Sequence, residues 1–148
     1  MVLIDNEQTI KIDTQKLQDD AQRIIEYLGY PDFEVSILLC DSPTMHEYNK
    51  QYRDKDKPTD ILSFSFYPLL RPGESIEALS EDEKNLGDII LCPEYIQSDL
   101  AQWEQSFELR LQVLLVHGIC HLLGYDHIED NDYIIMKAKE DELLKIIK

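Results

Sequence analysis

Apolar residues recur along the chain with two different periods, and these periods separate strands from helices. A period of two, or a short unbroken apolar run, predicts strands at residues 3–13 (in two short pieces about Glu7), 33–40, 60–67 and 86–92. Helical spacing, together with typical helix-start residues, predicts helices at residues 14–28, 42–51, 93–102, 106–123 and 130–148. The chain therefore contains both kinds of element in a mixed order, which favours one layered arrangement of helices on a sheet.

The residues at the element boundaries support this division. Thr14 can cap the first helix and Gly29 can end it, while Ser42 followed by proline is typical of the start of the second. Residues 68–85 hold two prolines, a glycine and an acidic stretch, which predicts a long exposed loop. The strands on either side of this loop can pair through it. We predict an α+β fold in which a mixed sheet of about four strands packs with helices, in one domain that spans residues 1–148.

Composition narrows the class of protein. The 148 residues suit one hydrophobic core, and no apolar run approaches the roughly 20 residues that a membrane helix needs. The first residues lack the basic start of a signal peptide. The cysteines are odd in number and each lies in an apolar run, which predicts buried, reduced thiols. These features together predict a cytoplasmic protein with no membrane association.

Three of the four histidines lie in one short stretch, His117-Gly-Ile-Cys-His121-Leu-Leu-Gly124-Tyr-Asp-His127. Residues four apart lie on the same face of a helix, so His117 and His121 can direct two imidazoles to one point. Gly124 can end the helix in a left-handed conformation and let the chain bring His127 to the same point. A lone histidine is more often a surface or core residue than a ligand. Two at this spacing, with a third after a glycine, predict a metal site.

Three neutral imidazoles favour a borderline-soft divalent cation, and we predict one Zn²⁺ per chain. A site with three protein ligands leaves the fourth position open, as catalytic zinc sites do. The spacing H-x-x-x-H-x-x-G-x-x-H matches the ligand frame of the metzincin proteases, which carry a glutamate base directly after the first histidine. Gly118 occupies that position here and cannot take a proton. The ligand frame without this base predicts a metal hydrolase that acts on something other than peptides.

With three further segments, the histidine motif resembles the YbeY family of endoribonucleases, which are also called rRNA maturation factors. The resemblance runs from the middle of the chain to its last helix, in the family's order. The segments that precede the histidine motif are Tyr52-Arg53, Lys57-Pro-Thr-Asp-Ile-Leu-Ser-Phe64 and Leu86-Gly-Asp-Ile-Ile90. The resemblance implies that His117, His121 and His127 bind the metal and that Arg53 is the arginine of the active-site cleft.

The resemblance also implies an activity and partners. It implies a zinc-dependent, single-strand-specific endoribonuclease that acts in rRNA processing, at the 3′ end of 16S rRNA, and in ribosome biogenesis and quality control. Single-stranded rRNA and the small ribosomal subunit or its proteins are the expected partners. Arg53 would stabilise the negative charge that develops on the phosphoryl group during cleavage. Asp60, Asp88 and Asp126 are candidates to orient the histidines, although each also suits a turn or a cap.

The net charge of −16 is unusual for a protein that binds nucleic acid. The charge is uneven, however, because residues 50–57 carry four cationic side chains against two carboxylates. Such a cluster is usually a solvated loop, and only the implied role of Arg53 favours an RNA contact there. Two alternatives to the nuclease remain: a zinc peptidase of the metzincin type, disfavoured by Gly118, and a ribosome-assembly factor with a structural metal.

Overall fold

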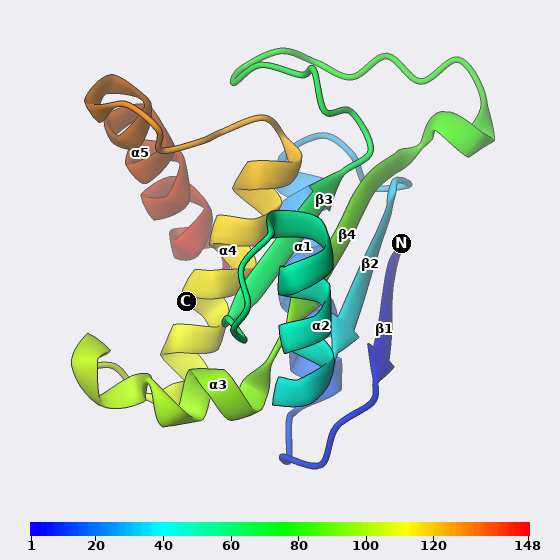
Figure 1. Ribbon diagram of the computed structural model, residues 1–148. Coiled ribbons are helices and arrows are strands. Elements are labelled where there is room, and N and C mark those ends of the chain that lie inside the picture. Colours follow the sequence, from blue (N-terminus) through cyan, green and yellow to red (C-terminus); the bar gives the residue numbers. More distant parts are fainter.

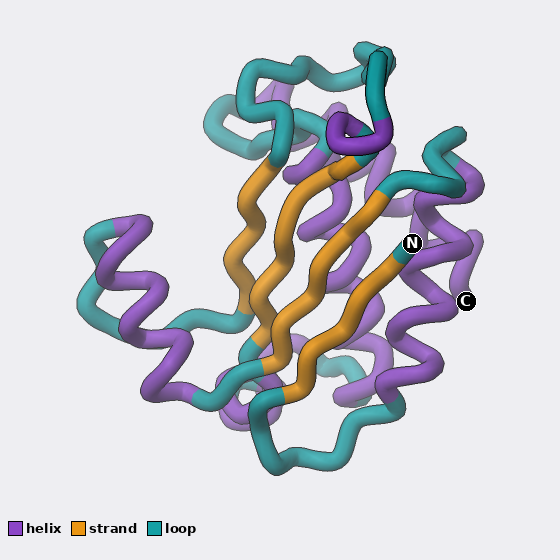
Figure 2. Tube along the Cα trace, turned by 90° about the vertical axis from the view of Figure 1, so that its right-hand side faces the viewer, coloured by secondary structure: helices purple, strands orange, loops and turns teal.

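A computed structural model describes residues 1–148, and its four strands form one mixed sheet (Figures 1 and 2). The strands are β1 (Val2–Asn6), β2 (Glu34–Leu39), β3 (Ile61–Ser65) and β4 (Asn85–Leu91). They lie in the order β1-β2-β4-β3, with β1, β2 and β4 parallel and β3 antiparallel to β4. The predicted α+β fold with a four-stranded mixed sheet is confirmed, and β3 lies at one edge of that sheet.

Five helices surround the sheet unequally. They are α1 (Thr14–Tyr27), α2 (Ser42–Arg53), α3 (Pro93–Ser98), α4 (Phe107–Leu122) and α5 (Asp130–Ile147). Helices α1 and α4 cover one face, and α5 packs against both of them (Figures 1 and 2). Helix α2 lies on the opposite face, where Met45 packs against Leu62 and Ile90. We call the first face the closed face and the second the open face.

Helix α4 is the centre of the closed face. Its buried residues join those of the strands and of α1 and α5 in one apolar core, in which Leu115 and Ile119 are fully buried. A helix that is apolar on most sides is one that other elements surround, and α4 packs against β3, β4, α1 and α5. None of the helices combines the length and the apolar character required for crossing a membrane.

Two helix starts differ from the prediction by one residue. The carboxylate of Asp13 accepts a hydrogen bond from the Lys16 amide at 3.0 Å, so Asp13 rather than Thr14 caps α1. Asp41 likewise accepts from the Thr44 amide at 3.0 Å, and it rather than Ser42 caps α2. Both pairs join two residue types that cap well, and periodicity does not distinguish neighbouring positions.

Three other elements differ from the sequence-based expectation. Only the first piece of residues 3–13 is a strand, because β1 ends at Asn6 and its pairing with β2 ends there too. The helix expected at residues 93–102 ends at Ser98 and is followed by a separate 3₁₀ turn, Leu100–Trp103. The long loop at residues 68–85 holds a second 3₁₀ turn, Glu81–Glu83, and is not wholly exposed. Its Leu70, Ile76 and Ala78 pack against the core.

Candidate metal centre

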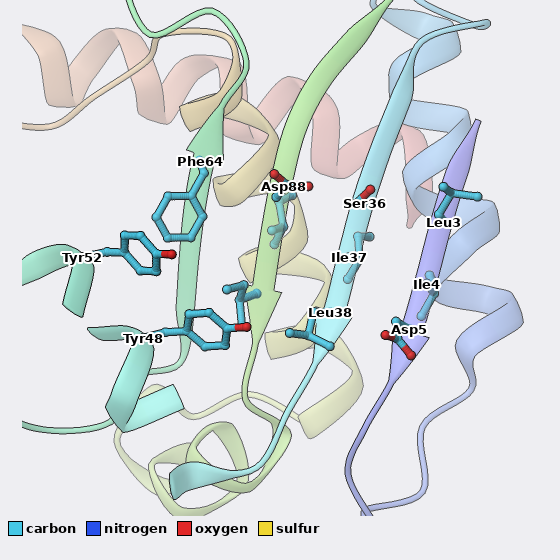
Figure 3. Close-up of a pocket in the computed structure, with 12 residues that line it drawn as sticks. Leu3, Ile4, Asp5, Ser36, Ile37, Leu38, Tyr48, Tyr52, Phe64 and Asp88 are labelled. Atoms are coloured by element: carbon cyan, nitrogen blue, oxygen red, sulfur yellow. The ribbon is translucent and has the colours of Figure 1, made fainter. Parts of the chain in front are cut away.

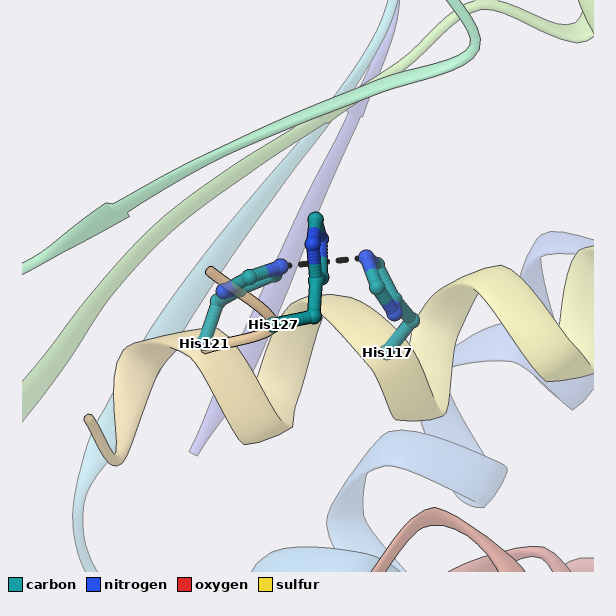
Figure 4. Close-up of side chains that lie close together, drawn as sticks. All are labelled: His117, His121 and His127. Carbon is teal, nitrogen blue, oxygen red and sulfur yellow. Dashed lines mark hydrogen bonds between the residues drawn. The ribbon is translucent and has the colours of Figure 1, made fainter. Parts of the chain in front are cut away.

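The three histidines converge at the C-terminal end of α4 (Figure 4). One ligand atom from each of His117, His121 and His127 lies within 4.8 Å of the others, and the Nε2 atoms of the first two are 3.0 Å apart. Tetrahedral zinc, with Zn–N distances of about 2.0–2.1 Å, holds its ligand atoms roughly 3.3 Å apart. The donor set and its spacing therefore fit a divalent ion bound by three imidazoles.

The turn after α4 brings His127 to the other two. Gly124 adopts φ +93° directly after the helix, and the Tyr125 amide donates to the Cys120 carbonyl at 3.1 Å. A Cβ atom at position 124 would lie 2.1 Å from the carbonyl oxygen of Leu70, so only glycine fits against the long loop there. The predicted glycine stop is confirmed, and the close approach of the loop gives it a second reason.

Glu140 orients the first histidine. Its Oε2 lies 2.9 Å from Nδ1 of His117, which leaves Nε2 of that ring facing the other histidines. Glu140 lies on α5, 23 residues beyond His117. No local spacing connects α5 to the histidine motif, so the sequence did not point to Glu140.

The three aspartates considered for this orienting role lie elsewhere or bond to other groups. Asp88 is on the open face of the sheet, away from the histidines. Asp60 lines the same cleft as the histidines but forms an ion pair with Arg110 at 3.5 Å. Asp126 lines the cleft as well, and its Oδ1 accepts the backbone amide of its neighbour His127 at 2.8 Å. The hypothesis is wrong for Asp88, and neither of the others bonds to a histidine ring.

Burial favours the uncharged form of the His121 imidazole. Desolvation lowers the pKa of His121, the neighbouring His117 lowers it further, and Asp126 partly opposes both. A metal ion requires a neutral imidazole, since a protonated ring has no free lone pair for it. The site therefore holds His121 in the protonation state that metal binding needs.

A cleft of about 640 Å³ connects the histidines with Arg53. All three histidines, Arg53 and residues of β3 line it, so the fold brings together segments that are more than 60 residues apart in the sequence. Arg53 is the last residue of α2 and is exposed. The arginine and the histidines therefore face one common space.

Buried Asn49 shapes the loop that follows Arg53. Its side-chain amide donates to the Lys57 carbonyl at 2.8 Å, and its backbone carbonyl accepts from the Lys55 amide at 3.2 Å. Asp54 ends α2 in a left-handed conformation with φ 56°. The loop is thus held in a defined conformation against the end of α2, where Lys50 of the helix lies 3.9 Å from the Asp56 carboxylate of the loop.

Gly118 lies where α4 meets the sheet. A Cβ atom there would lie 2.9 Å from Cδ1 of Ile61, 3.2 Å from Cδ1 of Ile89 and 3.2 Å from Oγ of Ser63. The position that holds the glutamate base in metzincins is therefore occupied by the helix–sheet contact in this protein. A carboxylate has no room there, which agrees with the absence of that base in the sequence.

Comparisons with known proteins agree with this site. The family model for Endoribonuclease YbeY matches residues 3–148. The Endoribonuclease YbeY of Clostridioides difficile is 34% identical over 148 residues, which cover 97% of this chain and 94% of that protein. The enzyme of the same name from Lysinibacillus sphaericus is 38% identical over 115 residues, covering 78% of this chain and 73% of that protein.

A solved structure supports the fold as well. The solution structure of a Thermotoga maritima protein superimposes with a TM-score of 0.65 at 26% identity, covering 99% of this chain and 89% of that one. The match therefore includes the sheet, the closed-face helices and the C-terminal helix together. On the family model and the identities above, this chain belongs to the YbeY endoribonuclease family.

Proposed function

We propose that this protein is a zinc-dependent endoribonuclease that cleaves single-stranded RNA. The observation that carries the proposal is the cleft that three converging imidazoles share with Arg53, in a chain of the YbeY family. His117, His121 and His127 would hold one ion per chain. Such an ion, when bound, supplies a Lewis acid and lowers the pKa of water to about 7.

Glu140 would orient a metal ligand, and Arg53 would bind the phosphoryl group. Glu140 accepts from Nδ1 of His117 and so presents Nε2 of that ring to the ion. Arg53 extends from the end of α2 into the cleft, where its planar guanidinium can donate two parallel hydrogen bonds to phosphoryl oxygens. Negative charge increases on those oxygens during cleavage, so a permanent cation facing them stabilises the transition state more than the substrate.

The location of the cationic side chains supports an RNA substrate in spite of the net charge of −16. Lys50, Arg53, Lys55 and Lys57 lie at the end of α2 and in the loop after it, and Arg53 among them lines the cleft. Acidic surface elsewhere would weaken non-specific RNA binding. The strand would thus be held by a few local contacts beside the metal.

Family membership supports rRNA as the physiological RNA, with the 3′ end of 16S rRNA as the position of cleavage and the small ribosomal subunit or its proteins as partners. The three buried cysteines are all free, which is typical of the reducing cytoplasm and supports that location. Precursor rRNA from cells with and without the protein, mapped at the 16S 3′ end, tests this part. Unchanged ends would restrict the proposal to RNA cleavage in general.

The direct test is cleavage of a labelled single-stranded RNA by the purified protein, with its duplex as a comparison. We expect endonucleolytic products from the single strand, their loss after chelation and their return when zinc is added. His46→Ala is the matched control, because His46 is the fourth histidine, does not line the cleft and pairs from α2 with Asp56 at 2.7 Å. Metal-loaded protein that leaves single-stranded RNA intact would contradict the proposal.

The peptidase alternative has one observation in its favour. β3 is an edge strand that lines the cleft, and an edge strand can pair with an extended peptide. The close packing around Gly118 disfavours a peptidase, because the glutamate base of the metzincins has no room at this position. Chelator-sensitive digestion of casein by the wild-type protein would support the peptidase instead.

A structural metal in a ribosome-assembly factor is the other alternative. His127 is exposed and the other two histidines are half-buried in an open cleft, whereas the apolar core packs without them. A metal at this position would therefore add little to the core. If metal removal lowers the melting temperature greatly while RNA cleavage is absent with metal, the structural role is favoured.

A further inference from the structure

A second hollow, of about 550 Å³, lies on the open face of the sheet beside α2 (Figure 3). Two rows of residues, each in register across all four strands, form its floor. One row is Phe64, Asp88, Ser36 and Leu3. The other is Leu62, Ile90, Leu38 and Asp5, in which Leu62 is buried in the cluster under α2 and does not line the hollow. Helix α2 lies on the β3 side of this face, and on the β1 side Leu3 and Asp5 are exposed.

Aromatic rings form the wall of this hollow. Tyr48 and Tyr52 extend from α2 over the sheet, with ring centroids 6.0 Å apart and an interplanar angle of 17°. Tyr52 meets Phe64 of β3 edge-on at 5.2 Å. Tyr52 is 56% exposed, so it is accessible to a ligand from solvent. Rings arranged in this way offer an apolar platform of the kind on which bases stack.

The same wall borders the candidate metal cleft. Tyr52 and Phe64 line both the hollow and the cleft that contains the histidines and Arg53. Tyr52 and Arg53 are consecutive residues at the end of α2. A nucleotide chain whose phosphate lies between Arg53 and the histidines therefore has the aromatic wall directly beside it.

Charge determines which part of a nucleotide the hollow can accept. Asp5 and Asp88 are on its floor, and neither forms an ion pair with a cationic side chain. Carboxylates repel a phosphate, but they accept hydrogen bonds from the exocyclic amino groups of bases. The hollow is thus suited to a base, while the backbone phosphate remains on the side of Arg53.

We propose that the open-face hollow binds the base of a nucleotide next to the scissile phosphate of single-stranded RNA, with that base stacked on Tyr52. The inference rests on the proposed nuclease function and extends it to a base subsite. A base can enter the hollow only if it is unpaired, so the subsite would also favour single strands over duplex. A basic peptide can pair with the two carboxylates and contact the rings through cation–π interactions. The nucleotide is favoured because Tyr52 and Phe64 continue from the hollow into the cleft of the histidines and Arg53.

The test is a double-mutant cycle between the base and the ring. Cleavage of a short RNA by metal-loaded wild-type protein would be compared with cleavage of RNAs that carry one abasic site at each position near the cut. We expect one adjacent position at which the abasic site lowers kcat/KM about tenfold, in accord with the usual contribution of a stacked base. Tyr52→Ala should lower kcat/KM for the intact RNA by a similar factor and remove the abasic penalty.

Further variants separate stacking from general damage. Tyr52→Phe keeps the ring and should retain the abasic penalty. Ser36→Trp fills the floor of the hollow from β2 and should remove the penalty as Tyr52→Ala does, with metal content unchanged. Tyr133→Ala is the matched control, because Tyr133 is 57% exposed on α5 and lines neither cavity.

The outcomes distinguish the two proposals. If no RNA is cleaved by the wild-type protein, the nuclease function itself fails. If RNA is cleaved but the abasic penalty is the same in wild type and Tyr52→Ala, the base subsite is wrong and the function stands. If Ser36→Trp leaves the penalty unchanged but abolishes binding of a lysine-rich peptide, the hollow belongs to a protein partner and the inference is overturned.

Discussion

On the closed face of the sheet, α1 and α4 bury every strand, whereas on the open face α2 alone covers the β3 side. The closed face contributes to a core of 25 buried residues, and the open face to a cluster of five. The floor beside that small cluster contains two carboxylates and a serine. The same strands thus supply the core through one face and a solvent-accessible surface through the other.

The candidate metal cleft lies where the two faces meet. β3 is the edge strand, so the histidines of α4 approach it from the closed face and Arg53 of α2 approaches it from the open face. The metal ligands come from α4 and the turn after it, on the side of the closed face, and the arginine comes from α2 on the open face. We expect substitutions on the closed face to affect stability and metal content, and substitutions on the open face to affect cleavage while stability is retained.

The largest effect is expected from Gly118→Glu. A carboxylate at this buried position would lie against Ile61 and Ile89, and we expect it to destabilise the fold by at least about 4 kcal/mol. Gly118→Ala should cost far less, because the side-chain ends it meets can shift slightly. Urea denaturation measures the free energy of unfolding of both variants. Gly73→Glu is the control: the space around Gly73 is open, so only its left-handed backbone conformation, worth about 1–2 kcal/mol, opposes the change.

A Gly118→Glu protein with wild-type stability would mean that the contact between α4 and the sheet yields easily. In that case the closed face would be less rigid than its burial indicates, and the missing base would need another explanation.

The next largest effect is expected from His121→Ala. Removal of one imidazole leaves two ligands, so most of the bound metal should be lost. RNA cleavage should then fall by at least about 100-fold, because the metal is required for it. Metal analysis of the purified variant and a cleavage assay measure the two effects, with His46→Ala as the control. Full metal content in His121→Ala would remove the three-histidine site from the proposal.

Glu140→Gln tests whether a closed-face helix tunes the metal site. The variant keeps the shape of the side chain but loses the charge that Nδ1 of His117 faces at 2.9 Å. Loss of such a partner typically weakens metal affinity about 10- to 100-fold. Competition with a chelator of known affinity measures the change. Asp141→Asn breaks an exposed pair with Lys137 on the same helix and should leave the zinc affinity unchanged. Equal zinc affinities in the two variants would mean that Glu140 does not contribute to metal binding.

Arg53→Lys is the open-face counterpart. Lysine keeps the positive charge but loses the planar pair of donors, so cleavage should fall by about tenfold while metal content and melting temperature stay the same. The steady-state rate on single-stranded RNA measures this effect. Arg23→Lys makes the same chemical change on α1, where the arginine bonds to the Ile146 carbonyl, and should not alter the rate. Wild-type turnover by Arg53→Lys would leave Arg53 as an ordinary loop charge.

Local chain geometry explains what the sequence could predict. The i,i+4 spacing of His117 and His121 and the left-handed turn at Gly124 depend only on neighbouring residues, so the ligand cluster follows from the motif. The two strands that flank the long loop were likewise expected to pair through it, and β3 and β4 do so. Short-range patterns therefore predicted most of the elements and the convergence of the histidines.

Tertiary packing explains what the sequence could not predict. Glu140 reaches His117 only because α5 packs across α4, and no period in the sequence encodes that crossing. Alternation assigns Asp88 to one side of β4, but it does not say which side the helices cover. For this reason the sequence showed neither that Asp88 lies on the open face nor that a hollow forms there.

The smallest effect is expected from the cysteines, and it compares the two faces directly. Cys120 lies in the core of the closed face, whereas Cys40 and Cys92 lie in the open-face cluster under α2. Burial raises the pKa of Cys40 and of Cys120 to about 12, and it also raises the pKa of Cys92. Thiol reagents attack the thiolate, so at pH 8 none of the three should react within minutes in the folded protein, and all three should react in denaturant. Mass spectrometry of the labelled sites measures this.

Equal protection of the three thiols would mean that water is excluded from the open-face cluster as well as from the core. Early labelling of Cys40 and Cys92 alone would show that α2 detaches from the sheet. Such detachment would also displace Tyr52 from the wall of the hollow.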